Sequence, residues 1–171
     1  LEQQLSSKTP LKNIELDQIS GQKNLSPYYF FNLENYVHYR LFEKCEFVWE
    51  VLSKLKEYIL SLKLGNISAD VPHQAFIEHP ELVSIGEGTI IEPGAFIRGP
   101  CVIGKDCQVR HGAYLRGNVL IGDNCVVGHA TEVKNAIFMD YAQAGHFAYL
   151  GDSVLGRYVN LGAGTKCANL K

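Results

Sequence analysis

The sequence is poor in the features that mark several protein classes. It has 171 residues, with one Met and one Trp. Its formal net charge is -2, so it has no overall positive charge that would attract nucleic acid or an anionic membrane. No apolar run approaches the roughly 18 residues of a membrane span. The start LEQQLSSKTP also lacks the apolar core of a signal peptide. We therefore predict a cytoplasmic protein with no nucleic-acid or membrane partner.

Cysteine is present in a pattern that disfavours its usual structural uses. The five cysteines are odd in number and form no C-x-x-C pair, which argues against a disulfide framework and against a zinc site. We predict that the chain requires no metal and that its thiols are free and buried. The cysteines are Cys45, Cys101, Cys107, Cys125 and Cys167.

The first half of the chain shows no repeat. Residues 1–31 are polar and without a period, which predicts an extended or mobile arm. Residues 32–66 begin at a candidate Asn32 cap and end at Gly65, and their apolar side chains recur at helical spacing, which predicts a helical segment. Such a stripe needs a surface to cover, and the rest of the chain is the expected partner. Residues 67–84 are assigned to a connector.

A six-residue repeat begins at Ile85 and dominates the rest of the chain. The first residue of each of nine hexads is aliphatic, and the fifth is nearly always small. The fifth residues are Thr89, Ala95, Cys101, Cys107, Ala113, Val119, Cys125, Thr131 and Ile137. This pattern, with one large and one small inward position in each hexad, is typical of a parallel β-helix with about 18 residues in each coil. We predict a mainly β protein whose residues 85–171 form a left-handed parallel β-helix, preceded by the short helical segment.

Three cations recur at the same place in the repeat. Arg98, Arg116 and Lys134 each follow a leading aliphatic residue, and each is 18 residues from the next. On a regular β-helix they would stack at about the 4.8 Å strand spacing, where like charges repel. This basic ladder indicates a bound anion such as phosphate. The alternative is three solvated cations that fan apart, helped by Glu132 or Asp152.

The stretch after Phe138 interrupts the repeat and carries a more specific signal. It contains AGHFAYLGDS followed by VNLGAGT. Together with the hexads from Ile85 to Lys171, it resembles the acetyltransferase β-helix of the bifunctional N-acetylglucosamine-1-phosphate uridylyltransferase / glucosamine-1-phosphate N-acetyltransferase family. It is more similar still to the C-terminal domains of archaeal sugar-1-phosphate nucleotidylyltransferases.

The resemblance implies a homotrimer in nucleotide-sugar biosynthesis that moves an acetyl group from acetyl-CoA to an amino sugar. The acceptor would be the amine of glucosamine-1-phosphate or galactosamine-1-phosphate. The general base would be His146, hydrogen-bonded by Glu132. The side chain of Asn169 would help to position the reacting groups. A neutral imidazole suits deprotonation of an amine.

The resemblance also implies a set of binding residues. Arg116, Lys134 and Tyr149 would hold the sugar 1-phosphate, which includes two members of the basic ladder. Asn160 would position the sugar, and the backbone amide of Ala163 would approach the thioester of acetyl-CoA. A bound phosphate would also fix the amine for attack.

The sequence departs from the family in ways that favour a second hypothesis. It lacks the nucleotidylyltransferase domain, so we expect no nucleotide-sugar synthesis by this chain. Further coils that grip coenzyme A in the bacterial enzymes, and a phosphate-binding Lys beyond the asparagine-containing loop, are also missing. The alternative function is therefore a non-catalytic module that binds a sugar phosphate or mediates assembly.

A third hypothesis is a zinc hydratase built on the same fold. It would need three His side chains that converge across a subunit interface. His111 and His129 are 18 residues apart, so they are expected to stack with each other instead. Their spacing does not match that class, and we interpret them as structural or solvated.

Overall fold

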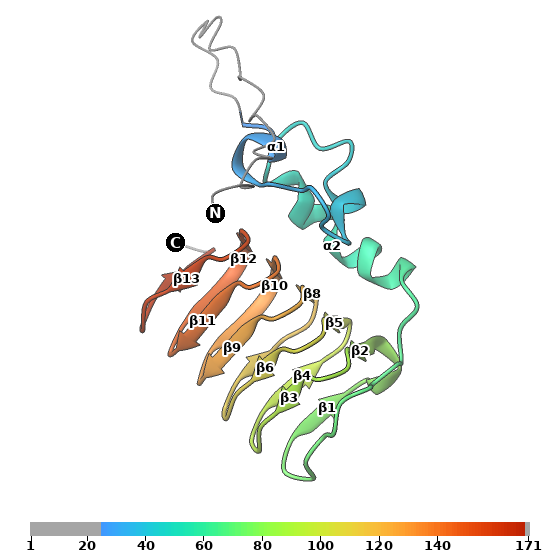
Figure 1. Ribbon diagram of the computed structural model, residues 1–171, viewed down its shortest axis with the longest axis vertical. Coiled ribbons are helices and arrows are strands. Elements are labelled where there is room, and N and C mark those ends of the chain that lie inside the picture. The colour runs from blue at the N-terminus through green and yellow to red at the C-terminus, as the bar shows by residue number, and fades with distance from the viewer. Residues whose placement is uncertain (1–24, 170–171) are drawn as a thin grey trace, which may run out of the picture.

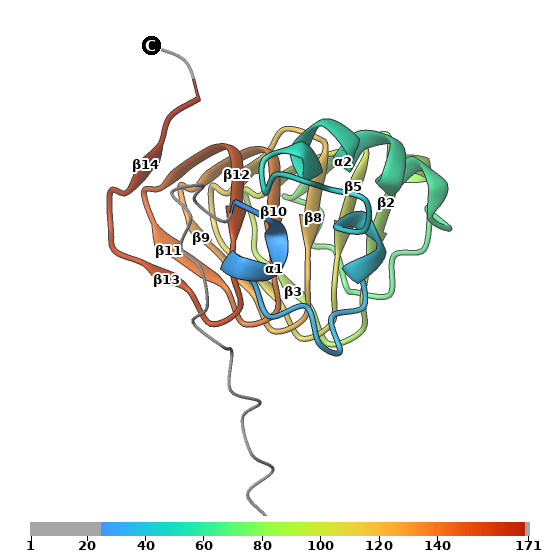
Figure 2. The same ribbon diagram turned by 90° about the horizontal axis from the view of Figure 1, so that it is seen from above.

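The computed structural model describes residues 25–169, and its main body is a parallel β-helix with three faces (Figures 1 and 2). The first face holds β1 (Phe76–Glu78), β4 (Phe96–Arg98), β7 (Tyr114–Leu115), the first halves of β10 (Glu132–Phe138) and β12 (Tyr149–Leu155), and β14 (Lys166–Cys167). The second face holds β2 (Val83–Ile85), β5 (Cys101–Ile103), β8 (Val119–Ile121), and the second halves of β10 and β12. The third face holds β3 (Ile90–Ile91), β6 (Gln108–Val109), β9 (Val126–His129), β11 (Gln143–His146) and β13 (Asn160–Leu161). The predicted fold class is confirmed: parallel strands form a solenoid of about five turns after a short helical segment.

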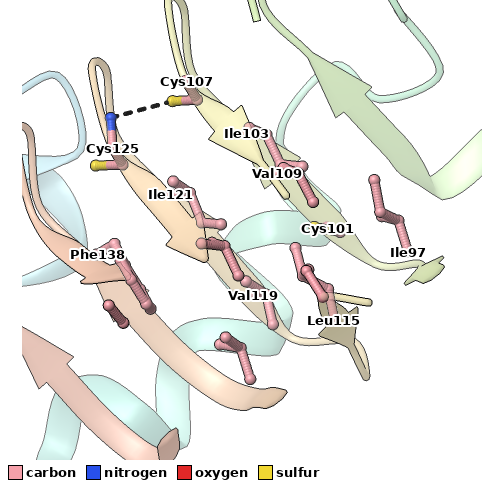
Figure 3. Packing of buried hydrophobic residues seen from close by; sticks show 14 of the residues in the cluster. Ile97, Cys101, Ile103, Cys107, Val109, Leu115, Val119, Ile121, Cys125 and Phe138 are labelled. Carbon is pink, nitrogen blue, oxygen red and sulfur yellow. Dashed lines mark hydrogen bonds between the residues drawn. The ribbon is translucent and has the colours of Figure 1, made fainter. Parts of the chain in front are cut away.

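The interior of the β-helix is built as the hexads predict. The leading aliphatic residue of every hexad is buried, and Figure 3 shows several of these side chains with the small residues that pack beside them. Cys101, Cys107 and Cys125 are buried in this core as free thiols. Burial raises the pKa of the Cys101 thiol, and the Cys125 backbone N–H donates to Cys107 Sγ at 3.4 Å. These thiols therefore act as compact core side chains.

The coil shortens from 18 to 17 residues at one corner. Glu132 pairs with Tyr114 and Ala136 pairs with Val119, so the corner between the first and second faces has one residue fewer in β10. Ala136 therefore takes the inward position. The prediction that Ile137 lies inside the β-helix is wrong, because the missing residue turns its side chain outward into a second apolar cluster.

The helical segment covers the second face (Figures 1 and 2). It contains a 3-10 turn at Tyr39–Leu41 and α2 (Glu50–Ser61). A short helix, α1 (Pro27–Phe30), precedes it within the residues 1–31 that were predicted to form an extended or mobile arm. Val51, Leu55 and Ile59 of α2 are fully buried in one cluster with the outward side chains Leu120 and Ile137 of the β-helix. The apolar stripe of the helix thus covers the rest of the chain, as expected. The first and third faces are left uncovered by the helical segment.

The first coil begins before the hexads are recognisable. Residues 67–84, assigned above to a connector, contain β1, a 3-10 turn at Pro80–Leu82 and most of β2, and Ile67 bridges Ile85. Residues 1–24 of the predicted arm lie outside the described residues, as do Leu170 and Lys171 at the end of the predicted β-helix. Between residues 25 and 169, no helix has the length and apolarity needed to cross a bilayer.

Candidate functional site

The predicted site residues lie on the last coils in two groups, one on each side of a corner. The chain leaves the third face at His146, turns through Phe147 and Ala148, and enters the first face at Tyr149. The first-face group consists of Arg116, Glu132, Lys134, Tyr149 and Asn169; the third-face group consists of His146, Asn160 and Ala163.

The basic ladder stands on successive strands of the first face. The register of β4, β7 and β10 places Arg98, Arg116 and Lys134 in one outward column. Arg98 pairs with Glu78, and Arg116 Nη1 donates to Glu132 Oε1 at 2.6 Å. This hydrogen bond raises the pKa of Arg116. The Lys134 ammonium forms no ion pair with any residue from 25 to 169, so of the three ladder cations it is the most available to an anion.

A hydrogen-bonded network lies next to Lys134. Both oxygens of Asp152 accept hydrogen bonds, one from Asn135 Nδ2 and one from Asn169 Nδ2. Tyr149 Oη donates to Asn169 Oδ1 at 3.3 Å. Partial burial alone would raise the pKa of Asp152, but the two amide hydrogen bonds and the charge of Lys134 outweigh it, and the pKa is lowered. Asp152 therefore stays ionised in this network.

A glycine makes room for this network in the ladder column. Gly151 follows Lys134 in register, and a Cβ at Gly151 would lie 2.8 Å from Tyr149 Oη and 2.9 Å from Asn169 Oδ1. Real Cβ atoms essentially never come this close to other heavy atoms. The column of basic side chains thus ends at Lys134, and the space at the next position, Gly151, is occupied by the Asn169 amide and the Tyr149 hydroxyl.

The third-face group centres on an open turn beside His146. The imidazole is exposed, and the register of β9 and β11 places His146 opposite His129. The carbonyl of His146 accepts a hydrogen bond from the Gly164 N–H at 3.1 Å, which brings the exposed Ala163 turn beside it. A Cβ at Gly162 or Gly164 would meet no atom within 4 Å. The surface around this turn is therefore open to a ligand.

Two predicted site residues are not joined to His146. In the part of the chain that the structure describes, no hydrogen bond links Glu132 to His146, and the Glu132 carboxylate accepts from Arg116 instead. Asn160 is exposed and lies opposite Gln143 on the third face. His146 and the carboxylate partner that the resemblance implies for it are thus on different sides of the corner.

His111 and His129 form the predicted stack at the same corner. Their ring centroids are 5.7 Å apart with planes 10° apart. His129 Nδ1 lies 2.9 Å from the carbonyl of His111, and His111 Nδ1 lies 2.6 Å from that of Pro93. Because a carbonyl only accepts, each Nδ1 is the donor. Among residues 25–169, no group of three or more His, Cys, Asp or Glu is placed to hold a metal ion.

Asp152 and Asn135 are the residues of this region that the sequence reasoning did not assign to the site. Asn135, Asp152 and Asn169 are 17 residues apart, which is the length of the shortened coils. A 17-residue period from Asn135 onward is therefore the sequence signal that places these three residues in one column.

All the candidate site residues lie within a region that is similar to known proteins. The family model of the GMPPB C-terminal domain matches residues 97–170. The bifunctional protein GlmU of Paracidovorax citrulli is 34% identical over 92 residues, which are 54% of this chain and 16% of that protein. The resemblance predicted from the sequence is confirmed. GlmU of Alkaliphilus metalliredigens is 28% identical over 173 aligned positions, which cover 81% of this chain and 38% of that protein. The alignments thus span less than half the length of these relatives.

Proposed function

We propose that the chain transfers an acetyl group from acetyl-CoA to the amine of an amino-sugar 1-phosphate. One observation carries the proposal. The exposed imidazole of His146 stands beside an open glycine turn, and the cations Arg116 and Lys134 lie on the next face, across one corner. An anionic acceptor and an acyl donor could meet at such a corner. The likeness to GlmU supports this class of chemistry.

The step requires one base and firm positioning. The amine nitrogen attacks the thioester carbonyl, a C–N bond forms, the C–S bond breaks, and coenzyme A leaves as the thiol. His146 accepts the amine proton, and this proton can pass to the leaving sulfur. Arg116, Lys134 and Tyr149 hold the phosphate and so orient the amine. The Ala163 N–H in the open turn would donate to the thioester oxygen as negative charge develops there.

Two titrations and one assay test the proposal. Isothermal titration of the full chain with glucosamine-1-phosphate and, separately, with acetyl-CoA should show binding of both. Mass spectrometry should then detect the acetylated sugar when both are present. The same measurements with galactosamine-1-phosphate identify the preferred acceptor.

A second candidate function is a non-catalytic module that binds a sugar phosphate. The ion pair between Glu132 and Arg116 favours it, because it leaves His146 without the carboxylate partner that the resemblance implies. Binding of the sugar phosphate without binding of acetyl-CoA and without product would establish the module and contradict the enzyme.

The chain is expected to form a three-fold trimer. The helical segment covers the second face, and the first and third faces remain as two different patches that can join head to tail in a closed ring. Light scattering should give three times the chain mass of 19.1 kDa. A mass of one chain would contradict the trimer.

Changing either Arg116 or Lys134 to Ala should weaken sugar-phosphate binding by about 10- to 100-fold, the range for hydrogen bonds to charged groups. Arg98→Ala is the matched control, because Arg98 stands in the same column and, like Arg116, is paired with a Glu, but its strand β4 lies two strands from Lys134 in β10. Titration calorimetry measures all three variants, and thermal unfolding should show little change. Equal affinity in all three and in the parent would identify the basic ladder as a solvated edge.

A further inference from the structure

Asp152 is hydrogen-bonded to Asn169 of the first-face group and, through Asn169, is linked to Tyr149. It accepts hydrogen bonds from Asn169 and Asn135, and Asn169 in turn accepts one from Tyr149. We propose that Asp152 is a positioning residue of the sugar-phosphate site, which acts by fixing the side chain of Asn169 beside Tyr149. The inference rests on the proposed function and adds a residue to the same site.

The carboxylate fixes which way the Asn169 amide points. An ionised carboxylate has no hydrogen to donate, so the NH2 group of Asn169 must face Asp152. Its Oδ1 then faces the Tyr149 hydroxyl. Their contact of 3.3 Å is long for an O–H···O bond, so the hydroxyl can turn to a phosphate oxygen at small cost. The Asn169 amide meanwhile keeps its hydrogen bond to Asp152, so its position beside Tyr149 does not change.

The position of Gly151 supports the same reading. The space that its missing side chain leaves is occupied by Asn169 Oδ1 and Tyr149 Oη. The site thus has a glycine that admits the amide, and next to it a carboxylate that orients the amide. Asn135 binds the other oxygen of Asp152 and fixes the carboxylate from the opposite side.

The charge of Asp152 makes the proposal sharply testable, because two roles predict opposite signs. Asp152 and Lys134 attract each other, so a purely electrostatic carboxylate would weaken the pull of Lys134 on a phosphate. Its removal would then tighten sugar-phosphate binding. A carboxylate that positions Asn169 predicts the reverse, since its removal would release the amide. The sign of the change therefore separates the two roles.

The test is titration calorimetry of Asp152→Asn with glucosamine-1-phosphate. Asn tolerates the left-handed backbone at this position, where φ is 45°, so the fold should be kept. The single amide oxygen that replaces the carboxylate in Asp152→Asn can accept from only one of Asn135 and Asn169, and the bond that remains loses its charge. We therefore expect affinity to fall by up to about tenfold, the effect of one hydrogen bond to a charged group. If acetyl transfer occurs, KM for the sugar should rise, and kcat should fall less than in His146→Ala, because the imidazole stands on the other side of the corner and is kept in Asp152→Asn. Asn135→Gly is the control, because glycine accepts the left-handed backbone at this position, where φ is 47°; affinity should change less than about twofold, because the bond between Asp152 and Asn169 remains.

A double-mutant cycle shows whether Asp152 acts through Asn169. In an Asn169→Ala background, Asp152→Asn should change affinity less than about twofold. Tighter or unchanged binding in Asp152→Asn alone would overturn the proposal, and so would an equal loss in the Asn169→Ala background. A parent protein that binds no sugar phosphate would contradict the proposed function, which is a different result from equal binding by parent and variant.

Discussion

Replacing His146 with Ala is expected to lower turnover by about 10²–10⁴, the usual contribution of a general base. Without the imidazole, no other group is assigned to take the amine proton as the C–N bond forms. Sugar-phosphate affinity should change little, because Arg116, Lys134 and Tyr149 lie on the first face. The measurement is formation of acetylated sugar by mass spectrometry at saturating substrates near pH 8, for the variant and the parent.

His129→Ala is the matched control for this prediction. His129 lies opposite His146 in the neighbouring strand, and it too carries an imidazole at the corner. Its Nδ1, however, donates to the carbonyl of His111 and its ring stacks on that of His111. Turnover should therefore be largely kept in His129→Ala. Equal turnover in His146→Ala and the parent would remove His146 from the mechanism.

The interior of the β-helix could be predicted because the hexad period alone decides it. Each leading aliphatic residue is buried, and the small residues at the fifth position, such as Cys101 and Cys107, pack beside them. The sequence also predicts that the helical segment packs on the rest of the chain, since an amphipathic helix needs an apolar surface to cover. Which face it covers could not be read from the period, because that depends on the outward residues. Leu120 and Ile137 supply the apolar surface on the second face.

The period failed where the coil loses a residue. The sequence was read in steps of six up to Ile137, but the corner before Ala136 is one residue shorter than the corner before Val119. A slip of one residue along a strand moves a side chain to the opposite face. Ile137 therefore lies under the helical segment and outside the interior. Aliphatic residues suit both places, so residue type gave no warning.

The sequence predicts which site residues stack in one column, but it does not predict which side chains form ion pairs. Steps of 18 place Arg98, Arg116 and Lys134 on one edge, as the register shows. The ion pair of Arg116 with Glu132 joins side chains of two neighbouring columns. Whether two such side chains meet depends on their lengths and conformations, which the repeat period does not specify. A step of 18 from Lys134 places Asp152 in the ladder column, whereas the 17-residue coil places Gly151 there and puts Asp152 in the next column with Asn135 and Asn169.

Gly128→Ala is expected to destabilise the fold strongly. Gly128 lies in β9 and is buried, and a Cβ there would overlap the carbonyl oxygen of Gly145 in β11. That oxygen belongs to the backbone of a paired strand, so it cannot move without disturbing the third face. We expect a loss of about 3 kcal/mol, the upper end for an overpacked site. Thermal unfolding should then show a midpoint lower by about 6–12 °C for a chain of this size.

Gly145→Ala is the control that isolates this overlap. Gly145 stands next to Gly128 in the same column, and a Cβ there would meet no atom within 4 Å. Both substitutions restrict the unfolded chain to the same extent, which alone would stabilise the protein by about 0.4–1 kcal/mol. The difference between the two midpoints therefore measures the steric overlap. The same carbonyl lies one residue before His146, so Gly128→Ala should also displace the imidazole and reduce acetyl transfer. Equal midpoints for the two variants would show that β9 and β11 pack less closely than the structure describes.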